Sequence, residues 1–169
     1  MAYNATMSPK ERLLQLENEG GYVFHGSPEG DLKVLSPRQG KHVPDLNKPT
    51  ESILDGKPAV SATPYAELAI FRAIINRKNV SFGHTSGFGT SEDGEKHFSV
   101  SSKEVLEVVK EKKGFVYVFD KKEFEPYNRD GVTNNKSMEW RSYAASTPIE
   151  IIEVSSNDLP PKNKIKIND

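Results

Sequence analysis

The sequence predicts a single α+β domain in which short strands outnumber helices. The chain has 169 residues, a length typical of one domain with a hydrophobic core of its own. Short runs of β-forming residues alternate with segments that carry helix-capping signals, and no internal repeat is visible. We therefore expect one unit over residues 1–169, with a helix within residues 1–20 and a polar tail at residues 155–169.

The composition excludes several classes of function. The 23 basic residues balance 24 acidic ones, so no bulk charge attracts nucleic acid or a membrane surface. There is no cysteine, which excludes disulfides, thiolate catalysis and cysteine-ligated metal. His84 and His97 lack the paired spacing of metal ligands, so no metal is expected. No signal-peptide pattern or membrane-length apolar run is present, so we expect a cytoplasmic protein, or one exported without a classical signal peptide, with no membrane partner.

The first half of the chain is expected to contain two helices and two strands. A capping box at residues 8–11 starts one helix, which a glycine pair ends, and an N-cap followed by proline starts another at residues 65–77. Apolar runs predict strands at residues 22–25 and 58–62. Residues 40–57 are rich in Pro, Asn, Asp and Lys, which indicates a long surface loop of the kind that often gates a site.

The second half is expected to add one helix and several strands. Residues 79–96 are rich in Gly, Ser and Thr, which predicts a mobile loop. A capping box at residue 101 starts a helix to about residue 113, which Gly114 ends. The continuous run 115–119 predicts a central strand buried on both faces. Three further strands are predicted at residues 97–100, 137–142 and 148–154, the last with apolar residues on both faces, and a polar loop at 127–136.

Candidate functional residues stand at the end of the first strand and on a later one. His25 and Gly26 come where the apolar run gives way to Ser-Pro. Glycine lets a ligand approach the backbone, and histidine offers two ring nitrogens for hydrogen bonds. The alternative is a strand end with a satisfied core histidine. Glu139 alternates with Met138 and Trp140, so its carboxylate is expected on the face of the strand opposite to the tryptophan.

Three separated pieces of the chain carry a resemblance. They are residues 22–27 with the His-Gly pair, residues 60–63 with the helix that follows, and residues 137–139 with the glutamate. Their order and strand context resemble the ADP-ribosyltransferase superfamily, in the branch of diphtheria toxin and the poly(ADP-ribose) polymerases. The resemblance spans about residues 22–154 and suggests a small bacterial or phage member. It implies a split β-sheet core of two packed, mostly antiparallel sheets, with about three flanking helices.

The resemblance implies NAD as co-substrate and gives roles to individual residues. The Gly26 backbone, with His25 beside it, would hold the nicotinamide amide and the adjacent ribose. Phe71 matches the aromatic residue that stacks on the nicotinamide ring. Glu139 matches the glutamate that binds the ribose hydroxyl and steadies the cationic sugar. The NAD-binding set implied by the resemblance is completed by Ser27, Arg38, Gln39, Ser61 and Thr63.

One position departs from the pattern of that branch. The tyrosine of its His-Tyr-Glu form is replaced here by Val60 or Ser61. Tyr65, just beyond, is the candidate for a second stacking partner. From the residues alone, a solvated turn is the favoured interpretation of Arg38 and Gln39, and an ordinary core position is the favoured interpretation of Phe71.

The expected reaction is ADP-ribose transfer from NAD to a macromolecule, either a nucleic acid or a protein. Cleavage of the nicotinamide glycosidic bond passes through an oxocarbenium-like state, which a carboxylate such as Glu139 stabilises without a metal or a covalent nucleophile. Hydrolysis of NAD remains open as the outcome. A toxin, effector or phage-defence enzyme is the expected context, with an antitoxin or immunity protein as a partner. The polar loop would select the acceptor through Tyr127, Arg129, Asn134 and Asn135.

Two alternatives remain open at this point. The first is an RNA 2'-phosphotransferase, which shares the fold and consumes NAD. Its basic triad would have to come from Arg38, Arg72 and Arg141, and a glutamate on the third motif strand does not belong to its pattern. The second is a catalytically silent module on the same fold that binds a nucleotide or a partner.

Overall fold

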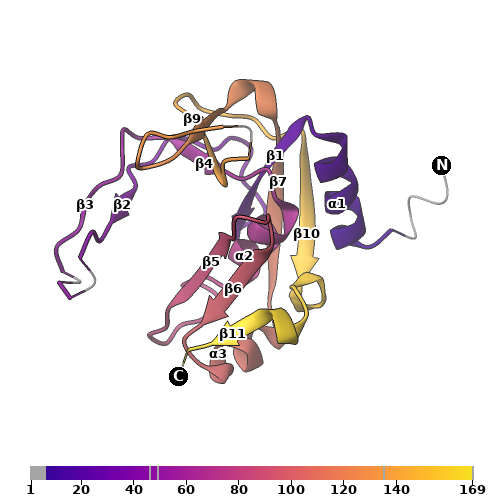
Figure 1. Ribbon diagram of the computed structural model, residues 1–169. Coiled ribbons are helices and arrows are strands. Elements are labelled where there is room, and N and C mark those ends of the chain that lie inside the picture. Colours follow the sequence, from indigo (N-terminus) through magenta and orange to yellow (C-terminus); the bar gives the residue numbers. More distant parts are fainter. Residues whose placement is uncertain (1–6, 46, 49, 135, 169) are drawn as a thin grey trace.

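The computed structural model describes residues 7–45, 47–48, 50–134 and 136–168. This part of the chain forms an α+β fold with three α-helices and several mostly antiparallel sheets (Figure 1). The expectations about the chain start near Met1 and about Asn135 concern residues outside the described ranges. Within those ranges, no helix is both long and apolar enough to cross a membrane.

The central sheet has three antiparallel strands in the order β1-β7-β10. Their bounds are Tyr22–Ser27, Lys113–Asp120 and Glu150–Ser155. Residues 116–119 of β7 are completely buried, because the strand has a partner on each side and hydrophobic clusters on both faces. The predicted central strand is therefore confirmed. The glycine of β1 does not end that strand as expected, since Gly26 and Ser27 continue the pairing with β7.

A second antiparallel sheet, ordered β4-β9-β8, covers one face of the central sheet. Its strands are Val60–Ala62, Glu139–Ser142 and Glu125–Tyr127. The two sheets join where Phe24 and Thr63 exchange backbone hydrogen bonds, with N···O distances of 2.7 and 2.8 Å. A hydrophobic cluster that includes Val23, Tyr117 and Trp140 fills the space between them.

The helices pack on the other face of the central sheet. Their bounds are Pro9–Glu19 for α1, Ala66–Ile74 for α2 and Lys103–Val108 for α3. The first helix begins as predicted, because the Ser8 hydroxyl accepts a hydrogen bond from the Glu11 amide, and it ends at Gly20 in the left-handed conformation. Helix α2 lies between the central sheet and the strands β5 and β6, and its inward face is apolar along its whole length (Figure 1).

Helix α2 approaches the central sheet so closely that only glycine fits beneath it. A Cβ atom on Gly26 would lie 2.1 Å from the Ala69 carbonyl oxygen and 2.7 Å from the Ala73 nitrogen. A Cβ on Gly114 of β7 would lie 2.0 Å from the Ala73 carbonyl oxygen. Gly26 therefore has a packing role in addition to any role toward a ligand, and Gly114 belongs to a strand rather than to a helix end.

A third sheet contains the strand predicted at residues 97–100 and extends into two regions for which the sequence predicted no regular structure. Its order is β11-β6-β5, with bounds Ile165–Ile167, Lys96–Val100 and Ser86–Thr90. The expected mobile loop at 79–96 thus contains a strand of a hairpin, and the expected polar tail at 155–169 contains a strand parallel to β6. Both predictions were wrong because β5 has only the partly buried Phe88 against the core and β11 only the buried Ile165, and both strands obtain their pairing from β6.

Smaller differences concern helix and strand ends. Helix α3 starts after Ser102 without a side-chain cap, and a 3₁₀ turn follows it, so the predicted helix to residue 113 is shorter. Strand β10 alternates between buried and exposed residues, so it is not apolar on both faces. The 3₁₀ turns are η2 Val109–Glu111, η3 Lys121–Glu123, η4 Ser156–Asp158 and η5 Lys162–Lys164.

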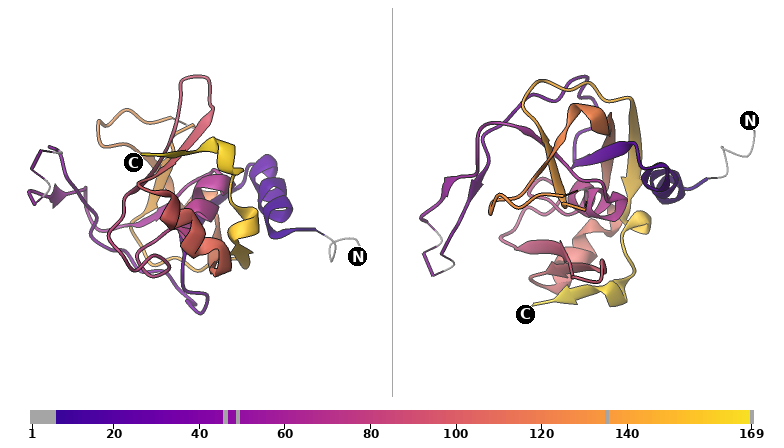
Figure 2. Two further views of the ribbon diagram at one scale, coloured as in Figure 1. Left: turned by 90° about the horizontal axis from the view of Figure 1, so that it is seen from below. Right: turned by 45° about the horizontal axis from the view of Figure 1, so that its top comes forward.

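The expected long loop at residues 40–57 projects from the body as an arm (Figures 1 and 2). Two short strands, β2 Lys41–His42 and β3 Ile53–Leu54, pair within the arm. The exposed side chains of Ile53 and Leu54 show that the arm does not pack on the core. The arm returns to the body at Asp55, which is buried.

Candidate functional site

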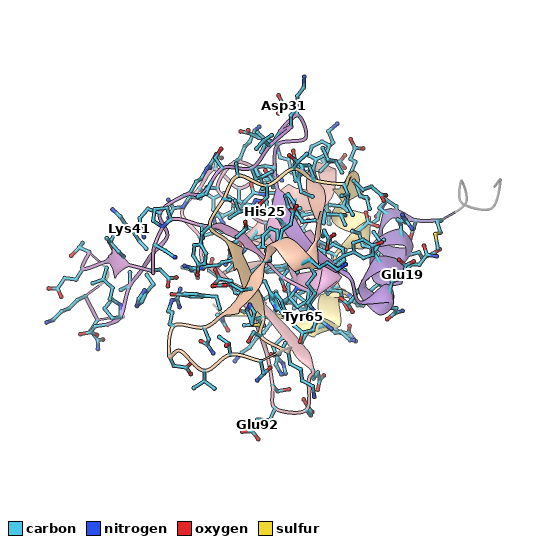
Figure 3. The ribbon with its side chains drawn as sticks, turned by 90° about the horizontal axis from the view of Figure 1, so that it is seen from above. Glu19, His25, Asp31, Lys41, Tyr65 and Glu92 are labelled. Atoms are coloured by element: carbon cyan, nitrogen blue, oxygen red, sulfur yellow. The ribbon has the colours of Figure 1, made fainter. Side chains whose placement is uncertain are left out.

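A cleft of about 980 Å³ opens where the two joined sheets, helix α2 and the polar loop meet. One wall comes from the end of β1 and from α2, and a second wall comes from β4 and from residues 127–134 and 136–139. Phe88 and Thr90 of β5 also line the cleft. This volume lies within the range usual for small-molecule sites. His25, whose place near the centre of the molecule is labelled in Figure 3, lines the cleft.

The three motif pieces meet in this cleft through direct contacts. The His25 Nδ1 atom lies 2.7 Å from the Ser61 carbonyl oxygen. The Ser61 hydroxyl donates to Oε2 of Glu139 over 2.9 Å. The antiparallel register of β4 and β9 places Ser61 opposite Arg141, and thus beside Glu139. Residues separated by 36 and 78 positions in the chain therefore form one continuous chain of contacts.

The Glu139 carboxylate is held on one of its two oxygens. Besides the Ser61 hydroxyl, Oε2 accepts a hydrogen bond from Nε of Arg141, with an N···O distance of 2.5 Å. Glu139 and Arg141 are two positions apart on β9, so their side chains lie on the same face of the strand. Within the described residues, Oε1 accepts no hydrogen bond from the protein. One oxygen thus fixes the orientation and leaves the other for a ligand.

Arg141 is itself fixed by Asp55 at the base of the arm. Its Nη1 donates to the Asp55 carbonyl oxygen over 2.7 Å, and its Nη2 lies 3.2 Å from Oδ2 of Asp55. The guanidinium also stacks on the ring of Tyr127, 3.5 Å from the ring centroid. The buried cation therefore has a carboxylate on each side and an aromatic face against it, so its position is tightly determined.

The Asp55 carboxylate accepts hydrogen bonds from the polar loop as well as pairing with Arg141. The Tyr127 hydroxyl donates to Oδ1 over 2.8 Å, and Nε of Arg129 donates to Oδ2 over 3.1 Å. Burial by itself would raise the pKa of Asp55, but these two hydrogen bonds and the charges of Arg129 and Arg141 outweigh it and lower the pKa. Asp55 is therefore ionised at neutral pH and anchors the arm, the polar loop and β9 together.

His25 is kept neutral by its surroundings. Desolvation lowers its pKa from the usual 6.5, the hydrogen bond to the Ser61 carbonyl opposes this, and the positive charge of Arg38 lowers the pKa further. Because a carbonyl oxygen can only accept, Nδ1 carries the proton in this contact. The other ring nitrogen, Nε2, is then an acceptor for a hydroxyl group.

The backbone of Gly26 faces the cleft. Phe24 directs its N–H and C=O groups to Thr63 of the second sheet, not to β7. In an antiparallel ladder these directions alternate, so Gly26, two residues further on, points its N–H and C=O to the same side as Phe24. That side is the cleft, which Gly26 lines. A donor and an acceptor are thus offered together to a planar amide.

The other residues predicted to bind NAD do not all line the cleft. Thr63 lines the cleft, and its hydroxyl accepts from the Tyr65 amide. Ser27 is buried, and its hydroxyl accepts from the Glu29 amide. Arg38 and Gln39 are exposed and lie outside the cleft lining, and the Gln39 amide donates to carbonyl groups at both ends of the arm. Of these four, only Thr63 faces the site directly.

Phe71 is not positioned to stack on a ligand. Its side chain is 0% exposed and packs against Phe98 and Phe88, with ring centroids 5.1 and 6.3 Å apart. The sequence placed it on the correct helix, but the apolar face of α2 is wide enough to take Phe71 into the core. Phe88, from the hairpin that the sequence did not predict, lines the cleft instead, as do Phe24 and Tyr127.

Tyr65 does not replace the missing tyrosine either. Its hydroxyl donates to the Lys136 carbonyl oxygen over 2.9 Å, and the ammonium group of Lys96 lies 5.0 Å from its ring centroid. These contacts fasten the polar loop to the start of α2. Tyr65 therefore supports the polar loop that lines the cleft, but it is not part of the cleft lining itself.

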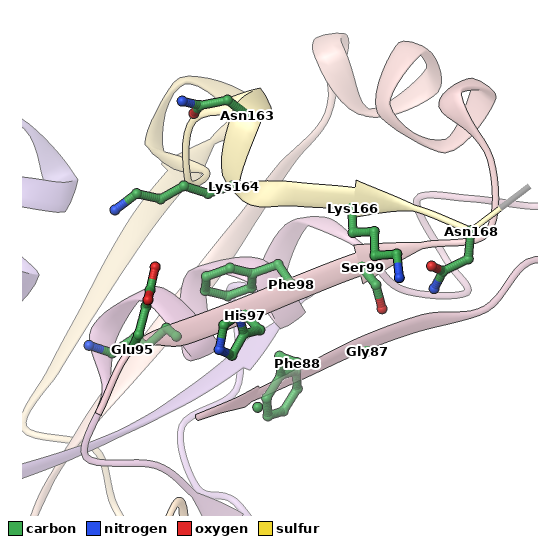
Figure 4. A pocket seen from close by; sticks show the side chains of 12 residues that line it. Gly87, Phe88, Glu95, His97, Phe98, Ser99, Asn163, Lys164, Lys166 and Asn168 are labelled. Carbon is green, nitrogen blue, oxygen red and sulfur yellow. The ribbon is translucent and has the colours of Figure 1, made fainter. Parts of the chain in front are cut away.

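A second hollow of about 800 Å³ lies on the third sheet (Figure 4). Its surface comes largely from strand backbone and from the exposed side chains of His97, Lys164 and Lys166. None of the predicted site residues contributes to it. Among the described residues, no three His, Asp or Glu side chains gather as metal ligands in either hollow.

Two residues of the network were not recognised as part of the site from the sequence. Arg141 could have been found, because a side chain two positions from Glu139 on a strand must share its face. Asp55 could not, because it follows an irregular segment and acquires its partners only when the arm folds back. Comparison of the chain with protein-family models, with curated proteins and with solved structures found no match.

Proposed function

We propose that the protein is an NAD-dependent ADP-ribosyltransferase with the split-sheet fold of that superfamily. The observation that carries this proposal is the contact chain from His25 through Ser61 to Glu139. The three segments that carry the resemblance to the superfamily come together in one cleft of about 980 Å³. Such a meeting is expected if the segments form one site.

The geometry of Glu139 suits cleavage of a glycosidic bond. With Oε2 occupied by Ser61 and Arg141, Oε1 is free to accept a hydroxyl of the nicotinamide ribose. As the bond to nicotinamide breaks, the bonding electrons leave with the nicotinamide nitrogen and positive charge develops on the sugar. A fixed carboxylate stabilises that charge, and it can also take the proton of the attacking acceptor.

The opposite wall suits the leaving group. The Gly26 N–H and C=O, directed into the cleft, match the acceptor and donor of a carboxamide. His25, neutral with Nδ1 protonated, offers Nε2 to a ribose hydroxyl. Phe71 is buried and takes no part in this contact. The proposal therefore retains the roles implied for His25, Gly26 and Glu139, and it drops the stacking role of Phe71.

The acceptor is a macromolecule, nucleic acid or protein, that reaches Glu139 past the polar loop. Residues 128–130 and 132 of this loop line the cleft beside Glu139. Transfer to an acceptor of this kind would suit a toxin, effector or phage-defence enzyme, with an antitoxin or immunity protein as a partner. The phosphotransferase alternative is less well supported, because Arg38 and Arg141 do not line the cleft and only Arg72 of the three does.

The test is to incubate the protein with NAD labelled on its adenine part, offering total RNA, denatured DNA and cell lysate in parallel. Glu139→Gln should lower transfer by about two to four powers of ten while leaving the fold intact. Glu125→Gln is the matched control, since this exposed glutamate lies in the same sheet away from the cleft lining.

Label retained on one class of macromolecule would name the acceptor. Release of nicotinamide without retained label would indicate an NAD hydrolase. Equal turnover by Glu139→Gln would remove the proposed catalyst, and binding of NAD without any release would favour the silent binding module.

A further inference from the structure

Arg72 presents an uncompensated positive charge inside the cleft. It stands on α2, its side chain is exposed, and it lines the cleft together with His25 and Glu139. Within the described residues, no carboxylate lies within 4.0 Å of its guanidinium, and it has no side-chain hydrogen-bond partner. Arg129, by contrast, forms a salt bridge with Asp55, with an Nη2···Oδ2 distance of 3.0 Å.

The guanidinium is held in a defined place. It lies over the ring of Phe88, with its central carbon 4.7 Å from the ring centroid. Phe88 packs edge-on against the fully buried Phe71, so the ring that supports the cation is anchored in the core. Surrounding protein atoms lower the pKa of Arg72 by desolvation, and no acidic neighbour offsets this effect. A planar, fixed cation without a counter-ion favours an anionic ligand.

The free edge of β5 adds unpaired donors beside Arg72. The hydrogen bonds from Ser101 to Thr85 and from Ser91 to Glu95 bracket the hairpin of β5 and β6. Because the direction of the backbone groups alternates along an antiparallel strand, Thr85, Gly87, Gly89 and Ser91 direct theirs to β6. Phe88 and Thr90 must then direct their N–H groups away from β6, and β5 is the last strand of its sheet. Both residues line the cleft.

We propose that Arg72, with the outer edge of β5 at Phe88 and Thr90, forms a phosphate-binding subsite. A guanidinium fork, backbone N–H groups and a hydroxyl are the groups that commonly bind phosphate oxygens in proteins. The phosphate is either the diphosphate of the dinucleotide or a backbone phosphate of a nucleic-acid acceptor. Naming these two sources rests on the proposed function, whereas the affinity for phosphate does not.

The experiment measures binding of ADP and of a single-stranded oligonucleotide to the unaltered protein and to Arg72→Gln. We expect Arg72→Gln to weaken binding of one of these ligands about 10- to 100-fold. Arg77→Gln is the matched control, because it removes the same charge from an exposed arginine just after α2 that does not line the cleft. Arg72→Lys should restore affinity only in part, since an ammonium group cannot reproduce the planar fork.

The outcomes separate this inference from the proposed function. Weaker ADP binding assigns the subsite to the dinucleotide, and weaker oligonucleotide binding with a shallower salt dependence assigns it to the acceptor. Equal affinities for Arg72→Gln and Arg77→Gln, or no binding of either ligand to the unaltered protein, would overturn the subsite. If ADP binding depends on Arg72 but no nicotinamide is released from NAD, the subsite stands and the proposed reaction fails.

Discussion

The two walls of the cleft are held in place by different forces. On the β1 wall, Gly26 lies directly under α2, and close apolar packing sets the position of the backbone. On the β9 wall, Glu139 is oriented by Arg141, which is in turn oriented by Asp55. The first wall depends on volume and the second on charge. The same site therefore has one part that is sensitive to an added methyl group and another that is sensitive to a removed charge.

This difference corresponds to what each wall is proposed to do. A backbone N–H and C=O that recognise a rigid amide need a fixed position and little else, which dense packing supplies. A carboxylate that stabilises a developing charge must stay ionised and correctly turned, which a buried arginine supplies. Changes on the two walls should consequently affect different measurements.

Gly26→Ala should have the largest effect, and it should act on folding. The new Cβ would lie 2.1 Å from the Ala69 carbonyl oxygen, so α2 must move away from the sheet. We expect the free energy of unfolding to fall by about 3 kcal/mol, the upper end of the usual range for overpacking, because the clash is with helix backbone. Gly89→Ala is the control, because its Cβ would meet nothing within 4 Å, and it should change stability by less than about 1 kcal/mol. Similar urea midpoints for the two variants would contradict a wall built on close packing.

Asp55→Asn should test the wall built on charge. It removes one of the two carboxylates that pair with the buried Arg141, which should cost about 3 kcal/mol of stability, the lower end of the range for breaking a buried pair. Arg129→Gln removes the other cation from the same carboxylate but should cost under about 1 kcal/mol, since that side chain is 57% exposed. Chemical denaturation of both variants measures the difference. Asp55→Asn with unchanged stability and unchanged nicotinamide release would show that the network does not hold β9.

Each wall should make its own contribution to the pH dependence of stability, through His25 on the β1 wall and through Asp55 on the β9 wall. Both pKa values are lowered in the folded protein, so both contributions are lost on acidification. The contribution of His25 is present above its usual value of 6.5 and is lost as pH falls through the lower folded value. The contribution of Asp55 is present above 3.8 and is lost as pH falls through its own folded value.

Unfolding free energies measured from pH 8 to pH 3 should therefore fall in two separate ranges. His25→Gln should flatten only the upper range, and Asp55→Asn only the lower one. A single transition common to all three proteins would mean that other groups control the acid response.

Ser61→Ala should have the smallest effect, and it should act on turnover. The Ser61 hydroxyl is one of two groups that donate to Oε2 of Glu139, so its loss should leave the carboxylate less well oriented. Under the proposed function this should raise the activation free energy by about 1 kcal/mol and slow nicotinamide release about fivefold. The melting temperature should hardly change, because Ser61 is exposed. Ser81→Ala, at an exposed position outside the cleft, is the control. Equal rates for the two variants would show that Arg141 alone orients Glu139.

The sequence predicted best the elements whose signals are local. The capping box at Ser8, the left-handed Gly20 and the continuous run that became β7 are each explained by residues within one turn or one strand. Two strands of the third sheet were missed because β5 has Phe88 as its one large apolar residue and β11 is only three residues long. Their strand structure comes from pairing with β6, which no local pattern expresses.

The same division applies to the candidate site. Its order along the chain, with His25 and Gly26 first, Ser61 next and Glu139 last, was determined by the sequence alone, and so was the face of β9 on which Glu139 stands. Only the tertiary structure decided that Phe71 is buried, that Phe88 lines the cleft in its place, and that Asp55 holds Arg141. Burial and ion pairing between distant segments depend on how those segments pack, and that packing is a property of the whole chain.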